Sequence, residues 1–308
     1  MDNVVAPKGV YAAVATPLKA NLDPDHTRFL EHCRWLLSHG CDGLAPLGTT
    51  GEANSIGMTG KLELIRFLAE SGLPMRRMII GTGSTSIEDT VELSRAAIKA
   101  GAAGLLMLPP FYYTNPTEDG LFDYFSEVVK RLAPPQPQIY LYHIPMFTDV
   151  GIPLGLVGRL RQTFPGIFVG LKDSDGNFDY TLSFLQAFPG FAAFSGSEEF
   201  AMRNLVAGGW GCISATVNFS APLVAHRIAN RSTDNRALEE SINQLRRKIA
   251  AAGTISGTKA CLAQYKNDPE WKRCMPPNIE AEGDFSLSRL FESLQPIDEL
   301  QELYRPVR

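Results

Sequence analysis

Lys172 stands where a buried amine can act as a nucleophile. It follows the apolar run Phe168–Leu171, which is typical of a strand buried on both faces, and it precedes Asp173. Burial disfavours a charged ammonium group and favours the neutral amine, which attacks a carbonyl carbon to form a Schiff base. The alternative interpretation is a lysine at a rim, paired with Asp173. Lys259, in a predicted helix, is the rival nucleophile.

Tyr142 is the predicted proton carrier beside this lysine. In the run Ile139–Pro145, strand alternation directs Tyr140 and Tyr142 to one face and His143 to the other. Tyr142 precedes Lys172 by 30 residues, about one strand–helix period, so neighbouring strands would hold the two side chains at a similar height. A phenol beside a reacting amine can donate and accept protons. Tyr140 is interpreted as a core residue.

Two loops carry further candidate groups. In Gly48-Thr49-Thr50-Gly51-Glu52, backbone N–H groups and hydroxyls can hold a carboxylate or phosphate. The alternative is a glycine-rich turn whose threonines bond their own backbone. Tyr112 and Tyr113 follow two strand-stopping prolines, and their loop predicts either a substrate wall or a subunit contact.

The elements that must position these residues form a regular series. Eight apolar or β-branched runs, each starting 20 to 36 residues after the one before, alternate with helical patterns: Gly9–Leu18, Asp42–Leu47, Met78–Gly83, Gly104–Pro109, Gln138–Pro145, Ile167–Ser174, Phe191–Ser197 and Gly211–Asn218. This alternation predicts parallel strands with crossover helices, in an α/β fold of the (β/α)8 TIM-barrel type. An open doubly wound sheet is the competitor, but no GxGxxG follows the first run.

Helix signals divide the chain further. Ser86 is a predicted N-cap, and Gly40, Gly72 and Gly101 are predicted helix stops. Later helical patterns cover residues 233–252, 254–265 and 285–303, outside the repeat. We therefore expect a catalytic barrel over residues 1–230 and a C-terminal helical appendage over residues 231–308.

Composition excludes several classes of protein. The 308 residues carry a net charge of −4, which disfavours nucleic-acid and anionic-membrane partners. No apolar run reaches the roughly 20 residues of a membrane span, and the N-terminus shows no secretory signal. The five cysteines are scattered, which predicts neither a disulfide framework nor a metal site and suits a cytoplasmic protein.

At the ends of the predicted strands the chain resembles the dihydrodipicolinate synthase / N-acetylneuraminate lyase family of class I aldolases. The matching motifs are Gly48-Thr-Thr-Gly-Glu52, Pro110-Phe-Tyr-Tyr113, Tyr142-His-Ile-Pro145, Gly170-Leu-Lys172-Asp and Gly211-Cys-Ile-Ser-Ala-Thr, and the resemblance covers roughly residues 9–300. It implies pyruvate as the keto acid, an aldehyde as its partner, a homotetramer built as a dimer of dimers, and no metal or organic cofactor.

The resemblance also implies a role for each matching residue. Lys172 would form the imine and Tyr142 would transfer protons. Thr49 and Thr50, with Gly48, would hold the keto-acid carboxylate, and Thr49 would join the proton relay. Two further residues complete the implied site: Tyr113 would reach across a dimer interface, and the main chain of Ile213 would lie against pyruvate.

Three positions bear on the substrate. Where dihydrodipicolinate synthases carry an arginine for the aldehyde's carboxylate, this chain has Phe147, followed by Thr148. His143 replaces the family asparagine and would either bind a substrate hydroxyl or face the barrel–helix layer. Glu198, with Glu199, resembles the acidic segment that holds substrate hydroxyls in sugar-acid lyases; the alternative is an acidic helix N-terminus.

The leading prediction is therefore reversible cleavage of a 2-keto-3-deoxy sugar acid, or a related 4-hydroxy-2-keto acid, to pyruvate and an aldehyde. The first alternative is dihydrodipicolinate synthase, which condenses pyruvate with aspartate semialdehyde. Imine formation coupled to dehydration or decarboxylation stays open. Alternatives from other classes are a non-catalytic keto-acid-binding barrel and a phosphate-binding barrel isomerase that uses Gly208 and Gly209.

Overall fold

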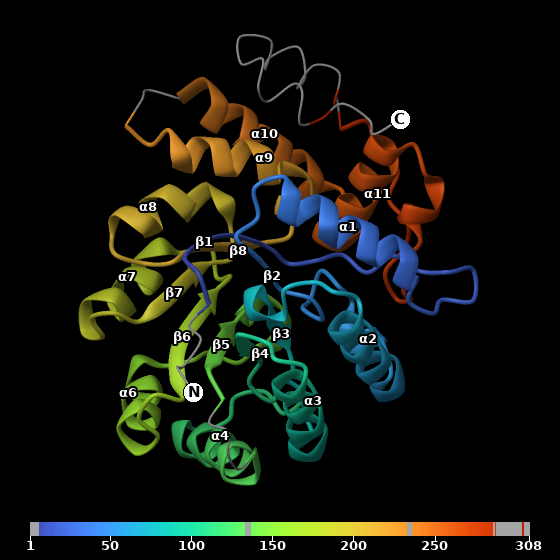
Figure 1. Ribbon diagram of the computed structural model, residues 1–308. Helices are drawn as coiled ribbons and strands as arrows, with labels where there is room; N and C mark the ends of the chain where they lie inside the picture. The colour runs from blue at the N-terminus through green and yellow to red at the C-terminus, as the bar shows by residue number, and fades with distance from the viewer. Residues whose placement is uncertain (1–5, 133–136, 233–235, 286, 288–303, 305–308) are drawn as a thin grey trace.

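The computed structural model describes residues 6–132, 137–232, 236–285, 287 and 304, and its centre is a ring of parallel strands (Figure 1). The strands are Gly9–Ala12 (β1), Gly43–Leu44 (β2), Ile79–Gly81 (β3), Gly104–Met107 (β4), Ile139–His143 (β5), Phe168–Asp173 (β6), Ala192–Ser195 (β7) and Gly211–Ser214 (β8). Each lies within one of the eight predicted runs, whose remaining residues precede or follow the strand.

The strand order closes the ring. Hydrogen-bonded neighbours run β2-β1-β8-β7-β6-β5-β4-β3, and every pairing is parallel. A parallel bridge between Leu44 and Met78 joins the two ends. The predicted (β/α)8 barrel is confirmed, and the open doubly wound sheet is wrong.

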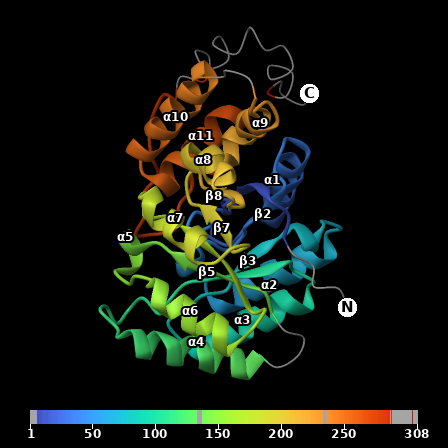
Figure 2. The same cartoon turned by 90° about the vertical axis from the view of Figure 1, so that its left-hand side faces the viewer.

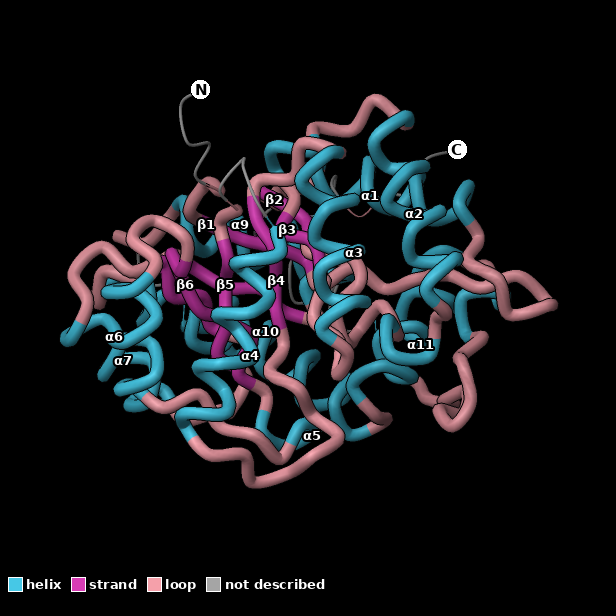
Figure 3. Tube along the Cα trace, turned by 90° about the horizontal axis from the view of Figure 1, so that it is seen from below, coloured by secondary structure: helices cyan, strands magenta, loops and turns pink. Residues whose placement is uncertain are grey.

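Helices surround the strands, as the view from below shows (Figure 3). Those of the repeat are His26–Ser38 (α1), Met58–Glu70 (α2), Ile87–Lys99 (α3), Glu118–Leu132 (α4), Leu154–Thr163 (α6), Phe178–Ala187 (α7), Ala201–Val206 (α8) and Val217–Ala229 (α9), with Pro145–Thr148 (α5) as a short turn after β5. Ser86 caps α3 by accepting a hydrogen bond from the Asp89 N–H. Gly40, Gly72 and Gly101 follow α1, α2 and α3 with positive φ angles, as predicted.

The barrel interior is filled with side chains. Tyr11, Leu106, Tyr140, Phe194 and Ile213 are buried there in one apolar cluster. A Cβ on Gly170 would lie 2.6 Å from the Tyr140 ring, so the tyrosine depends on that glycine. Because the interior is packed, a substrate can bind only at an end of the barrel, and in this fold sites lie at the carboxyl ends of the strands.

Two C-terminal helices, Arg236–Ala251 (α10) and Thr254–Lys266 (α11), lie with α9 at one end of the molecule (Figures 1 and 2). Leu245 and Ile249 of α10 belong to the main hydrophobic cluster between strands and helices. The helix predicted over residues 285–303 lies outside the described residues except at positions 285 and 287. Among the described residues, no helix is long and apolar enough to cross a membrane.

Candidate active site

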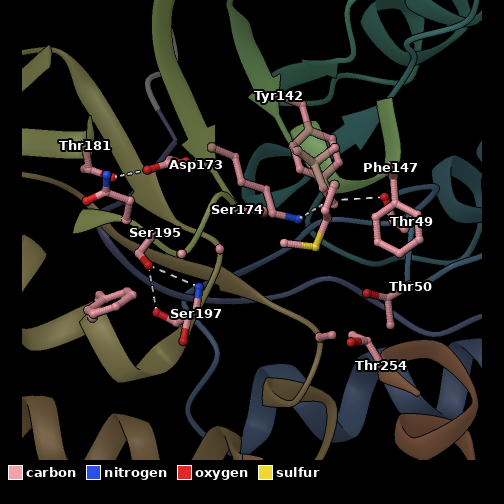
Figure 4. Close-up of a pocket in the computed structure, with 18 of the residues that line it drawn as sticks. Thr49, Thr50, Tyr142, Phe147, Asp173, Ser174, Thr181, Ser195, Ser197 and Thr254 are labelled. Atoms are coloured by element: carbon pink, nitrogen blue, oxygen red, sulfur yellow. Dashed lines mark hydrogen bonds between the residues drawn. The ribbon is translucent and has the colours of Figure 1, made fainter. Parts of the chain in front are cut away.

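Lys172, Tyr142 and Thr49 form a short hydrogen-bonded chain at the carboxyl end of the barrel. Tyr142 and Thr49 are labelled in the close-up of the cavity (Figure 4). The Lys172 Nζ donates to the Tyr142 hydroxyl at 3.0 Å, and the same hydroxyl lies 3.1 Å from the Thr49 Oγ1. Lys172 and Tyr142 are each only 3% exposed. Among the described residues no carboxylate lies within salt-bridge distance of this amine, whose hydrogen-bond partner is a phenol.

Strand register explains why these groups meet. Tyr142 of β5 is the register partner of Lys172 of β6. The prediction that two residues one period apart would share a height in the barrel is thereby confirmed. Thr49 comes from the loop after β2, across the ring, and only closure of the barrel brings it to the tyrosine.

The chain of three borders a cavity of about 160 Å³. Thr50, Ile144, Phe147 and Ala215 are among the side chains that line it, and they come from segments that follow three different strands, β2, β5 and β8. The C-terminal helices also contribute, through Arg246 of α10 and through Thr254 and Ile255 of α11. The expected boundary near residue 230 thus separates two parts of the chain that share one cavity.

Asp173 and His143 point away from the amine. The Asp173 carboxylate accepts hydrogen bonds from the Thr181 hydroxyl at 2.5 Å and from its own loop at Asp175 N, and lies 3.0 Å from the His143 Nδ1. The His143 ring stacks on Tyr180 of α7 at 4.2 Å. His143 therefore faces the barrel–helix layer, and Asp173 does not pair with Lys172.

A second buried lysine, on α11, anchors the loop after β2. Glu52 has a left-handed φ of 55°, and its side chain contacts the C-terminal helix α11. Its carboxylate pairs with Lys259 of α11 and accepts a hydrogen bond from the Met275 N–H at 2.7 Å. The Lys259 amine also donates to the Arg273 carbonyl. Because this amine is held by a carboxylate, Lys259 does not suit the part of rival nucleophile.

Glu198 lies in a network of protein donors. It belongs to the short helical turn Glu198–Phe200 after β7, and its side chain is fully buried. The carboxylate accepts hydrogen bonds from Ser214 at 2.5 Å, from Thr216 and from the Arg246 Nη1 at 3.1 Å. The structure thus directs the Glu198 carboxylate to these protein groups, where the sequence suggested substrate hydroxyls.

Arg246 was not anticipated from the sequence. It lies in the middle of α10, outside the eight-unit repeat, where an arginine on an amphipathic helix is normally a solvent-facing residue. In the structure it lines the cavity and its side chain is 25% exposed. No sequence pattern predicts that Arg246 lines the cavity, because its position depends on the packing of α10 beside α9.

The remaining predicted residues differ in their burial and in whether they line the cavity. Thr50 lines the cavity and is buried. Gly48 accepts a backbone hydrogen bond from Ala53 and so shapes the threonine loop. Ile213 is fully buried in the inner barrel cluster on β8. Tyr113 is 78% exposed and packs edge-on against Tyr112, and it does not line the cavity of its own chain.

Phe147 occupies the position where the resemblance would place an arginine. It belongs to α5, lines the cavity and is 61% exposed. The next residue, Thr148, is buried, and its hydroxyl donates to carbonyls of its own turn. Among the described residues, therefore, no guanidinium enters the cavity from the β5 side.

Comparison with known proteins agrees with this geometry. The model of the dihydrodipicolinate synthetase family matches residues 6–287. The chain belongs to this family. It is 30% identical to an uncharacterized DapA-like lyase of Chloroflexus aurantiacus over 88% of this chain and 91% of the relative.

Solved structures extend the likeness to three dimensions. Dihydrodipicolinate synthase from Agrobacterium tumefaciens superposes with a TM-score of 0.83 at 30% identity, covering 94% of this chain and 99% of that one. A 2-keto-3-deoxygluconate aldolase from Picrophilus torridus, at 22% identity and a TM-score of 0.80 over 90% of this chain and 99% of that one, shares the fold. Members of the family are lyases, and this protein is accordingly an enzyme of that class.

Proposed function

We propose that this family member is a Schiff-base aldolase that reversibly cleaves a 4-hydroxy-2-keto acid, such as a 2-keto-3-deoxy sugar acid, to pyruvate and an aldehyde. The observation that carries the proposal is the Lys172 amine: it is buried, free of any carboxylate partner among the described residues, and bonded to the Tyr142 hydroxyl. A covalent imine on lysine supplies the electron sink, so the proposed reaction requires neither a metal nor an organic cofactor.

The chain of three accounts for the proton transfers. The Lys172 amine adds to the substrate's 2-keto carbon, Tyr142 donates its proton to the departing hydroxyl, and loss of water gives a protonated imine and a Tyr142 phenolate. Tyr142 then accepts the proton of the 4-hydroxyl, the C3–C4 bond breaks, and its electron pair enters the imine as an enamine while the aldehyde leaves. Protonation at C3 and hydrolysis release pyruvate and regenerate the amine. Thr49 hydrogen-bonds Tyr142 and passes protons along the same line.

The threonine loop is the proposed carboxylate site. Thr50 lines the cavity beside Thr49, and the loop backbone from Gly48 onward offers N–H groups. The carboxylate of the keto acid would lie here, next to the amine that attacks the adjacent keto carbon. The main chain of Ile213 on β8 would lie against pyruvate.

Condensation of pyruvate with aspartate semialdehyde is the second candidate, because it uses the same imine. Phe147 in place of the arginine disfavours it. A non-catalytic keto-acid-binding role gives Lys172 and Tyr142 no purpose. The phosphate-isomerase alternative fails on position: Gly208 and Gly209 precede β8 and lie at its amino end, opposite Lys172.

Tyr113 enters the proposal as a residue of a neighbouring subunit. Its exposure on a loop beside Tyr112, 76% exposed, suits a subunit contact in a dimer of dimers. Mixing the inactive variants Lys172→Met and Tyr113→Phe after subunit exchange tests this arrangement. Activity should return in mixed dimers, because one site then combines an intact lysine with an intact partner tyrosine. Failure to complement, in dimers shown by mass measurement to be mixed, would oppose the arrangement.

Borohydride trapping tests the central proposal. The protein is incubated with pyruvate, reduced, digested and analysed by peptide mass spectrometry. We expect a reduced pyruvyl adduct on Lys172. An adduct on Lys259 would move the site, and no adduct on folded protein in excess pyruvate would reject the imine mechanism.

A further inference from the structure

Arg246 gives the cavity a positive group that the proposed chemistry does not use. In the part of the chain that the structure describes, two other charged residues, Lys172 and Asp173, line the cavity, and the Asp173 carboxylate is engaged with Thr181 and His143. Lys172 becomes part of the imine. The guanidinium of Arg246 is therefore the charged group left to meet the rest of the substrate.

One nitrogen of the Arg246 guanidinium makes all of its hydrogen bonds to the described residues. Its Nη1 donates to Glu198 at 3.1 Å, to Thr216 at 3.2 Å and to Ser214 at 3.3 Å. Among the described residues, Nε and Nη2 make no hydrogen bond. These two nitrogens share one edge of the planar guanidinium, the edge that binds a carboxylate through two parallel hydrogen bonds.

The Glu198 network explains how the free edge is oriented. Glu198 is fully buried, and Ser214, Thr216 and Ser220 each donate to its carboxylate. A carboxylate fixed in this way holds the Nη1 of Arg246 over the ends of β7 and β8. Glu198 is thus a positioning residue for the arginine, which rationalises an acidic side chain that does not itself line the cavity.

We propose that Arg246 binds a carboxylate carried by the aldehyde half of the substrate, so that this enzyme acts on a 4-hydroxy-2-keto diacid. This inference rests on the proposed aldolase function. It places the second carboxylate on the β7–β8 side of Lys172, whereas an arginine at position 147 would place it on the β5 side. This chain has phenylalanine at position 147 on α5 and carries its arginine, Arg246, on α10.

The test compares two aldehydes that differ only at the far end. Tartronate semialdehyde ends in a carboxylate, and glyceraldehyde ends in a hydroxymethyl group. With pyruvate as the common partner, we expect wild-type enzyme to favour tartronate semialdehyde in kcat/KM, mainly through KM. Removal of the bidentate contact should lower the ratio of the two kcat/KM values by about tenfold to a hundredfold.

The variants are chosen because Arg246→Met alone would leave Glu198 buried without its cation. The double variant Glu198→Gln/Arg246→Met removes both charges together. The single variant Glu198→Gln keeps the arginine and, in its amide oxygen, an acceptor for Nη1. We expect the acid preference to be lost in the double variant and to be only partly reduced in the single one. An equal preference in wild type and double variant, or a wild type that favours glyceraldehyde, overturns the inference.

Two readouts separate this inference from the function on which it rests. The borohydride adduct on Lys172 reports the imine alone. Calorimetric binding of tartronate reports the arginine contact without any chemistry, and its affinity should fall by about tenfold or more in the double variant. A wild type that forms the adduct yet binds tartronate no better than the double variant keeps the aldolase and rejects the role of Arg246.

Discussion

Two buried lysines, less than a hundred residues apart in sequence, occupy opposite chemical situations. Lys172 is 3% exposed and Lys259 is fully buried. The Lys172 amine meets a phenol, whereas the Lys259 amine meets the Glu52 carboxylate and the Arg273 carbonyl. Burial alone therefore does not make a lysine reactive. We assign the proposed nucleophile to Lys172 because its partner is a phenol, whereas an amine paired with a carboxylate is held in an ion pair.

The largest effect should come from Lys172→Met. We expect the borohydride adduct to disappear and the aldol rate to fall by about 10³-fold or more, because the covalent route is lost. The free energy of unfolding should stay level or rise, since methionine fills the space without burying a polar amine. Steady-state kinetics and chemical denaturation measure the two effects. Turnover that survives the substitution would contradict the assignment of Lys172 as nucleophile.

The matched substitution Lys259→Met should act on stability. Removal of one partner of a buried ion pair leaves the Glu52 charge uncompensated, at a cost of about 3–5 kcal/mol in unfolding free energy. Denaturant titration measures the loss. The double variant Glu52→Gln/Lys259→Met should recover most of it. A Lys259→Met protein as stable as the wild type would erase the contrast between the two lysines.

Tyr142→Phe tests whether the phenol beside Lys172 carries protons. We expect kcat to fall by about a hundredfold, because a general acid–base group contributes on that order. Mass spectrometry should still find the adduct on Lys172, formed more slowly. Tyr140→Phe is the control, since that ring belongs to the inner core. Equal effects at the two tyrosines would indicate loss of packing rather than loss of a proton carrier.

The smallest effect is expected at Thr49. Replacement by valine removes the hydroxyl that contacts Tyr142, and we expect a loss of about tenfold in kcat/KM, the value of one hydrogen bond. Thr49→Ser keeps the hydroxyl and should behave nearly as wild type. Identical kinetics for the valine and serine variants would remove Thr49 from the proton relay.

Local sequence patterns determined much of this protein. The alternation of apolar runs and amphipathic helices predicted the barrel, because each unit must bury a strand and one helix face against its neighbours. The apolar run before Lys172 and the spacing to Tyr142 predicted their proximity, because equal positions in neighbouring units lie at equal heights. Both predictions concern one strand–helix unit and its neighbour, and such relations follow from a periodic sequence pattern.

Only the tertiary structure decided which charged groups meet. Lys259 pairs with Glu52 across 207 residues, and Arg246 bonds Glu198 across 48. Neither pairing follows from any period, because α10 and α11 stand outside the repeat. Barrel closure also brings Thr49 to Tyr142 from 93 residues away. Electrostatic partners depend on distances of a few ångströms in space, and a sequence specifies those distances only through the packing of the whole chain.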